Sequence, residues 1–143
     1  MNTSNSPQLN IAINAALSAG KVVMRYYSRL DTLKIKEKGV NDYVSEADLE
    51  SEKIIIASLT KTYPDYKITA EESGSSTIES EYEWFIDPID GTTNFIHGIP
   101  HFAVSIGLCK NKTPVLGVIY DPFKNELFTA EKGKGALLND KKI

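Results

Sequence analysis

The sequence lacks several features that would place it in a special class. It has one cysteine, Cys109, among 143 residues, which excludes an internal disulfide. No apolar run approaches the ~20 residues that a membrane-spanning helix needs. Positive charge is not in excess, since 16 basic residues stand against 19 acidic ones. These absences argue against a membrane protein and against direct binding to nucleic acid or to an anionic membrane surface.

The amino terminus also lacks the basic and apolar regions of a secretory signal. Together with the single cysteine, this favours a cytoplasmic protein. Cys109 lies in the apolar run FAVSIGLC, where we expect a small buried side chain. Because the composition is 41% hydrophobic and shows no linker or repeat, residues 1–143 are expected to form one compact domain.

Two helices are predicted in the first half of the chain. Apolar residues at three- and four-residue spacing predict an amphipathic helix over residues 7–28, with Pro7 tolerated in its first turn. A second helix is expected over residues 45–62, because Ser45 and Asp48 have the spacing of a capping box. The residues of this helix that are expected to face the core are Ile55, Ile56 and Leu59.

The remaining segments predict short strands. LKIKEKGVNDYV alternates weakly and breaks at Gly39, which indicates either a hairpin or a mobile loop, with its lysines facing water. YKIT predicts a strand, and FAVSIGLC, VLGVIYD and ELFTA predict neighbouring antiparallel strands, since turn residues separate them. KGKG at residues 132–135 predicts a tight turn before one more strand. This order predicts an α+β fold in which two long helices pack on a largely antiparallel sheet.

The stretch WFIDPIDGTTNF combines strand residues with carboxylates. Residues 84–86 predict a buried strand, so Asp87 emerges at its carboxyl end, where open α/β sheets collect ligands. Asp90 follows across a turn, and Gly91 permits a sharp bend. A short helix should come next, and its free N-H groups suit a phosphate. The candidates for its cap are Thr92, Thr93 and Asn94.

The paired carboxylates of this stretch require neutralisation. Two carboxylates about 4 Å apart repel by roughly 4 kcal/mol at an effective dielectric constant near 20. Oxygen ligands shared with a substrate phosphate favour Mg²⁺ over a caged Ca²⁺. A plain β-turn is the alternative explanation of D-P-x-D-G. A second acidic pair, Glu71 and Glu72, follows the strand YKIT and favours the metal site, if Glu71 converges on Asp87.

DPIDGTTNF, with AEES at residues 70–73 and SEAD at residues 45–48, resembles the inositol monophosphatase family. KGVNDYV, HFAVSIGL, YDPFKNELFTA and KGKGA extend the resemblance from the first helix to the last residue. It implies the layered α/β sandwich of inositol monophosphatases and fructose bisphosphatases. It also implies a Mg²⁺-dependent, lithium-sensitive phosphatase acting on a small phosphate monoester, inositol 1-phosphate. A bisphosphate nucleotidase or a fructose bisphosphatase of the same superfamily is the nearest enzymatic alternative.

The resemblance further implies a metal-ligand set. Glu71, Asp87 and the backbone carbonyl of Ile89 would hold a first Mg²⁺, and Asp87 would share a second with Asp90. In the family pattern Glu71 also counts among the catalytic residues, and Asp90 among the residues that bind substrate.

The resemblance assigns the phosphate and the attacking water to neighbouring residues. Backbone N-H groups of Gly91 and Thr92 would bind the phosphate, and the Thr92 hydroxyl, oriented by Asp48, would help to activate water. For Asp48 a capping box alone is an equally good explanation.

Other candidates are weaker. Lys36 and Lys38 lie on the loop that approaches the metals in the family, but solvated lysines are the simpler interpretation. Gly98 and Pro100 lie between His97 and His101, so we interpret these histidines as loop residues and not as a helical zinc pair.

The chain also departs from the family. Family members are about twice as long, and the W-D-x-A-A-G motif of their second half is absent here. We therefore expect a fragment that binds a cation weakly, turns over little, and exposes apolar surface that favours association. Family members commonly form dimers, which leaves a homodimer open. One bacterial protein that this sequence resembles acts in ribosomal RNA transcription, so a non-catalytic partner of the transcription machinery is the alternative of a different class.

Overall fold

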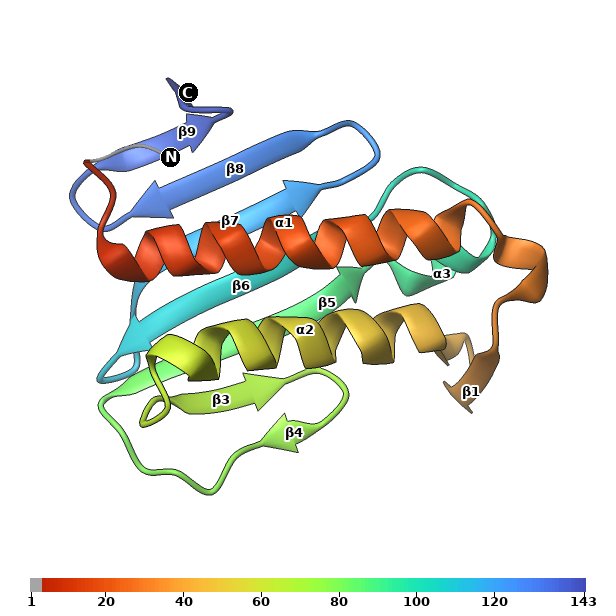
Figure 1. Ribbon diagram of the computed structural model, residues 1–143, viewed down its shortest axis with the longest axis horizontal. Helices are drawn as coiled ribbons and strands as arrows, with labels where there is room; N and C mark the ends of the chain where they lie inside the picture. The colour runs from red at the N-terminus through yellow and green to blue at the C-terminus, as the bar shows by residue number, and fades with distance from the viewer. Residues whose placement is uncertain (1–3) are drawn as a thin grey trace.

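The computed structural model describes residues 4–143 as two helices packed on a mixed sheet (Figure 1). The helical elements are α1 (Pro7–Tyr27), the 3-10 turn η1 (Leu30–Thr32), α2 (Glu46–Thr62) and α3 (Thr92–Ile96). The strands are β1 (Ile35–Gly39), β2 (Asp42–Ser45), β3 (Lys67–Ala70), β4 (Gly74–Ser75), β5 (Tyr82–Asp90), β6 (Ala103–Lys110), β7 (Thr113–Asp121), β8 (Glu126–Glu131), β9 (Gly135–Leu138) and β10 (Lys141–Lys142).

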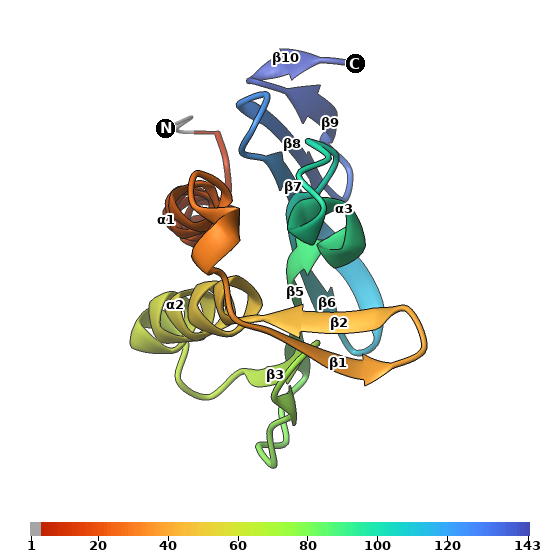
Figure 2. The same cartoon turned by 90° about the vertical axis from the view of Figure 1, so that its right-hand side faces the viewer.

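The main sheet has the strand order β10-β9-β8-β7-β6-β5-β3-β4. Only β3 and β5 pair in parallel within the described residues, and the other neighbours are antiparallel. Figure 2 shows α1 and α2 on one side of this sheet. The α+β prediction, with two long helices on a largely antiparallel sheet, is confirmed. None of the helices in the described part of the chain combines the length and apolarity that crossing a bilayer requires.

Helix α1 ends one residue earlier than predicted and packs closely on β7. The Ser6 hydroxyl accepts a hydrogen bond from the N-H of Leu9 and caps the helix. A methyl group at Gly20 would stand 2.5 Å from the Tyr120 ring. The absence of a side chain at Gly20 therefore lets the helix approach the sheet.

Helix α2 begins with the predicted capping box, in which Ser45 and Asp48 exchange hydrogen bonds. Ile55 and Leu59 are fully buried, and Ile56 packs against the core while partly exposed. The segment before α2 is the antiparallel hairpin of β1 and β2, which decides between the two alternatives left by the sequence.

Strand β5 corrects the prediction that residues 84–86 are all buried. Trp84 and Ile86 point into the core, but Phe85 is 43% exposed. The strand alternates faces, and the helices cover only one of them. Ile119 of β7 is equally exposed, so the expected exposed apolar surface is present.

The same alternation corrects the prediction for Cys109, which is half-buried because its neighbour Leu108 takes the core position. Burial and the nearby Glu83 carboxylate raise the pKa of the Cys109 thiol. The segment of residues 132–135 is the predicted turn, with Gly133 at a positive φ of 84°. Two short strands, β9 and β10, follow it where one was expected.

Candidate metal and phosphate site

The parallel pairing of β3 and β5 brings two acidic side chains together. Ala70 is paired with Ile86, so Glu71, which follows β3, lies beside Asp87. Asp87 does not end its strand as predicted, because β5 continues to Asp90 with an irregular register between these two residues. The N-H of Glu71 donates to the carbonyl of Ile86 at 2.9 Å, which continues the pairing by one residue. The convergence that the sequence could only assume is therefore present in the structure.

The pKa of Asp87 is raised in this environment. Burial raises its pKa to about 6, and the negative charges of Glu71 and Asp90 act in the same direction. A hydrogen bond from the Ile89 backbone lowers the pKa but does not compensate. The sheet thus holds a half-buried Asp87 carboxylate that is repelled by two exposed ones, and a cation would relieve both the desolvation and the repulsion of Asp87.

The turn after Asp90 depends on Gly91. Strand β5 runs through Asp90, and Gly91 has a φ of 95°, in the left-handed region. A Cβ at Gly91 would lie 2.9 Å from the carbonyl oxygen of His101. Gly91 is the N-cap of α3, which corrects the prediction that Thr92, Thr93 or Asn94 caps this helix. Only a glycine suits both the positive φ and the close backbone contact.

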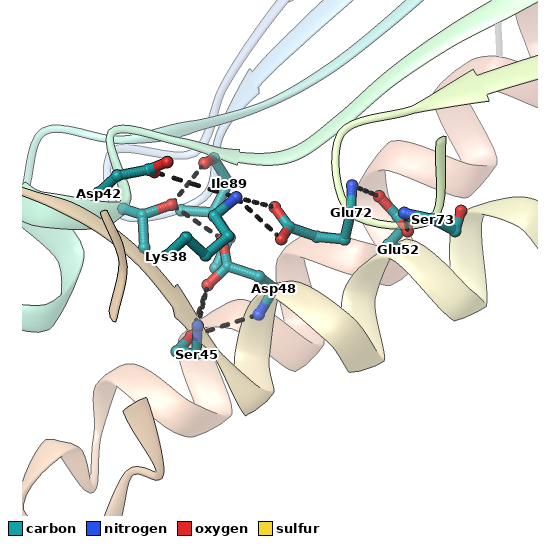
Figure 3. A network of polar contacts seen from close by, with 9 residues as sticks. Lys38, Asp42, Ser45, Asp48, Glu52, Glu72, Ser73 and Ile89 are labelled. Carbon is teal, nitrogen blue, oxygen red and sulfur yellow. Dashed lines mark hydrogen bonds and ion pairs between the residues drawn. The ribbon is translucent and has the colours of Figure 1, made fainter. Parts of the chain in front are cut away.

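Thr92 and Asp48 meet across 44 residues of sequence. The Thr92 hydroxyl lies 2.8 Å from Asp48 Oδ1 and 3.0 Å from the carbonyl oxygen of Ile89, so its single proton is directed at these acceptors. Asp48 Oδ2 accepts the N-H and the hydroxyl of Ser45 at 2.9 and 2.6 Å (Figure 3). The two explanations of Asp48 are thus compatible, because one oxygen caps α2 and the other holds Thr92.

The environment of Asp48 is strongly buried. The residue is 1% exposed, and burial raises its pKa, while the hydrogen bonds from Ser45 and Thr92 oppose the shift. A buried carboxylate with three donors has few alternative positions. The Thr92 hydroxyl is therefore firmly oriented.

Two residues near the site were missed or misread from the sequence. Lys38 Nζ donates to Glu72 Oε1 at 3.1 Å, so Lys38 is ion-paired and not merely solvated, while Lys36 is exposed as predicted. Burial raises the pKa of Glu72, and Lys38 counteracts it. Glu52 of α2 accepts hydrogen bonds from the backbone N-H groups of Glu72 and Ser73. No sequence signal marks either contact, because the partners are 34 and 20 residues apart.

These elements surround an open pocket of about 270 Å³. Its lining includes Lys38, Glu71, Asp87, Ile89, Asp90, Gly91 and Thr92. Within residues 4–143, no three His, Cys, Asp or Glu side chains are grouped closely enough to hold a metal ion by themselves. Carbonyl, water or phosphate oxygens must therefore complete any coordination sphere here. That mixture fits Mg²⁺, which retains water and shares substrate phosphates.

The two histidines do not lie together on one helix, as a helical zinc pair would. His97 is the C-cap of α3, and its Nδ1 is 2.7 Å from the Thr93 carbonyl oxygen. His101 follows in the exposed loop before β6. Both are loop residues, as predicted.

Comparison with known proteins relates almost the whole chain to one family. The profile of the inositol monophosphatase family matches residues 4–143. The Nus factor SuhB of Haemophilus influenzae is 50% identical over 140 residues, which cover 96% of this chain and 52% of that protein. The inositol-1-monophosphatase of Mesorhizobium japonicum is 46% identical over 139 residues, with 96% and 52% covered.

A solved structure resembles this chain in fold as well as in sequence. The crystal structure of the extragenic suppressor protein suhB from Bartonella henselae matches with a TM-score of 0.94 and 46% identity, covering 96% of this chain and 54% of that one. The chain thus spans about half the length of the relatives it matches. The family profile and the match in sequence and fold show that the chain belongs to the inositol monophosphatase family.

Proposed function

We propose that residues 1–143 form the amino-terminal, metal-binding portion of a Mg²⁺-dependent phosphomonoesterase. The observation that carries this proposal is the convergence of Glu71 and Asp87 beside the hydrogen-bonded pair of Thr92 and Asp48. The first pair needs a cation, and the second holds a hydroxyl group next to it. Family membership supports the combination.

Glu71, Asp87 and the Ile89 carbonyl would hold a first Mg²⁺, and Asp87 and Asp90 would hold a second. Bound there, Mg²⁺ would neutralise the carboxylates, polarise a phosphate and make a water molecule more acidic. Asp87 is suited to a shared position because the charges of both Glu71 and Asp90 act on its carboxylate. A second half of the protein would have to complete the ligands of the second metal.

Thr92 and Asp48 would orient the attacking water. Because the Thr92 proton is directed at Asp48 and the Ile89 carbonyl, the lone pairs of the Thr92 oxygen are left to accept a proton of that water. The buried Asp48 carboxylate keeps the hydroxyl in this orientation. The Thr92 side chain therefore positions a nucleophile and forms no covalent bond.

The turn at Gly91 would receive the phosphate. Gly91 and Thr92 lie at the start of α3 and line the same pocket as the carboxylates, and their backbone N-H groups would bind the phosphate. Inositol 1-phosphate is the proposed substrate because relatives include an inositol-1-monophosphatase. A nucleoside bisphosphate and fructose 1,6-bisphosphate are the alternatives within the superfamily.

Phosphate release tests the proposal. Inositol 1-phosphate, a nucleoside 3',5'-bisphosphate and fructose 1,6-bisphosphate would each be assayed with Mg²⁺, with and without Li⁺. Both this chain and a chain extended to the full length of its relatives are needed. We expect little turnover by the short chain and Li⁺-sensitive turnover of one substrate by the long one. Absence of Mg²⁺-dependent release of all three substrates by the long chain would contradict the proposal.

A second function is favoured by the names of relatives. Proteins of Haemophilus influenzae and Escherichia coli that are 50% and 47% identical are called Nus factor SuhB. We therefore also propose a protein partner in the transcription machinery. Binding of purified transcription components to the long chain and to its Asp87→Asn variant would test this, because a function independent of metal should survive the substitution.

A further inference from the structure

Helix α2 carries two buried carboxylates on one face. Asp48 and Glu52 are four residues apart, a spacing that places side chains one above the other on a helix. They are 1% and 4% exposed. A charged side chain at that depth is costly unless it is fully hydrogen-bonded. Asp48 is accounted for by Ser45 and Thr92, which leaves the purpose of Glu52 to be explained.

Both oxygens of Glu52 hold the backbone that follows β3. Oε1 accepts the N-H of Glu72 at 2.9 Å, and Oε2 accepts the N-H of Ser73 at 3.0 Å (Figure 3). Such charge-assisted bonds are short and strong. The residue that precedes these two N-H groups is Glu71, so Glu52 fixes the turn on which Glu71 stands.

The same turn is tied from its other side. The Glu72 carboxylate is 7% exposed and receives the Lys38 ammonium at 3.1 Å, while its backbone N-H points to Glu52. Figure 3 shows Glu72 between Lys38 and Glu52. Lys38 is the more exposed of the two partners, with 30% of its side chain accessible. The contact with Glu52, which is 4% exposed, thus involves the less accessible of the two partners of Glu72.

We propose that Glu52 is a positioning residue for the metal site, acting through the backbone of Glu72 and Ser73 on Glu71. This inference rests on the function proposed above. Helix α2 then serves as a fixed spacer, since Asp48 holds Thr92 and Glu52, one turn later, holds the turn after β3. A single helix therefore fixes the position of Thr92 relative to the turn that carries Glu71.

Mn²⁺ binding is the direct test, measured by the electron paramagnetic resonance signal of free Mn²⁺ in titrations of the chain. Glu52→Gln keeps the shape but presents an amide N-H₂ to one backbone donor. Glu52→Asp keeps the charge but is too short to reach both N-H groups. Glu79→Gln, at an exposed position, is the matched control for loss of one charge. We expect both Glu52 variants to bind about 10- to 100-fold more weakly, and the control to equal the parent chain.

Amide hydrogen exchange gives a readout that does not depend on metal. The N-H groups of Glu72 and Ser73 should exchange at least about tenfold faster in both Glu52 variants, a change equivalent to ~1.4 kcal/mol, while those of β5 and β6 stay protected.

The outcomes separate the inference from the proposed function. Unchanged Mn²⁺ affinity in the Glu52 variants would overturn the positioning role while leaving the metal site intact. Weakened affinity in Glu52→Gln with wild-type affinity in Glu52→Asp would also overturn it, because charge alone would then explain the effect. Failure of the parent chain to bind Mn²⁺ at all would refute the proposed function, and the inference with it.

Discussion

Replacing Asp87 with asparagine should stabilise the metal-free chain while abolishing metal binding. The aspartate is half-buried at the edge of the sheet, beside the negative charges of Glu71 and Asp90. Asparagine has nearly the same shape and still accepts the hydrogen bond from the Ile89 backbone. The substitution therefore removes the repulsion and the desolvation cost with little change in packing.

The magnitude follows from the pKa of Asp87, which is raised from 3.8 to about 6. A shift of about 2 units corresponds to ~3 kcal/mol at 1.36 kcal/mol per unit. Solvent screening of a half-buried group reduces this to about 1 to 2 kcal/mol. The folded state binds the proton more tightly than the unfolded state, so the stability of the parent chain falls as pH rises from 3.8 to about 6. Above about pH 6 the full cost is present.

Urea unfolding in the presence of EDTA measures the effect. At pH 7.5 the midpoint of Asp87→Asn should lie about 0.5 to 1 M urea above that of the parent chain, for a slope of ~2 kcal/mol per M. The difference should shrink as pH falls through 6 and vanish well below pH 3.8, where the aspartate is protonated in both states. Glu79→Gln, an exposed control, should change stability by less than ~0.5 kcal/mol. An Asp87→Asn chain that is no more stable than its parent at pH 7.5 would refute the electrostatic reasoning.

Three further substitutions test other parts of the structure. In the full-length protein, Thr92→Val should lower kcat for phosphate release by about 10²-fold or more, whereas Thr92→Ser should retain most of the activity. Equal activity of the two variants would exclude a role for the hydroxyl group. Gly91→Ala should lower the free energy of unfolding in urea by about 2 to 4 kcal/mol, because a positive φ and a 2.9 Å backbone contact act together. Gly74→Ala is the control: its φ is similar but its surroundings are open, so it should lower the free energy of unfolding by only about 1 kcal/mol. Gly20→Ala should destabilise the folded chain by about 1 to 3 kcal/mol in urea unfolding, because the methyl group meets the Tyr120 ring. The better helix propensity of alanine acts in the opposite direction, and a more stable variant would show that the ring moves freely.

Local signals in the sequence located the elements well. The capping box of Ser45 and Asp48 placed the start of α2, and the apolar spacing placed α1 to within one residue. Turn residues separated the strands of the meander. Such features depend on neighbours within about four positions, which is why a single sequence reveals them.

Features that depend on tertiary contacts were predicted less well. Phe85 was expected in the core, because periodicity does not reveal how many faces of a sheet are covered. Gly91 caps α3 because of a contact with a loop ten residues away, which favoured it over the better capping side chains that follow. The contact of Glu52 with residues 72 and 73 left no trace in the sequence, since a carboxylate on a helix is ordinarily solvated.

The candidate site lies between these two cases. The motif DPIDGTTNF indicated oxygen ligands and a phosphate-binding turn, but the approach of Glu71 to Asp87 required the parallel pairing of β3 and β5. That pairing joins strands separated by the segment that contains β4, and its direction was not predictable from spacing. The roles of the individual site residues remain predictions.

The anomalous signal of Mn²⁺ soaked into a crystal of this chain would locate the metal. We expect a peak among carboxylate oxygens of Glu71 and Asp87 and the Ile89 carbonyl oxygen, at about 2.0 to 2.3 Å from each. Density at another place only, or none at Mn²⁺ concentrations that saturate other sites, would contradict this expectation.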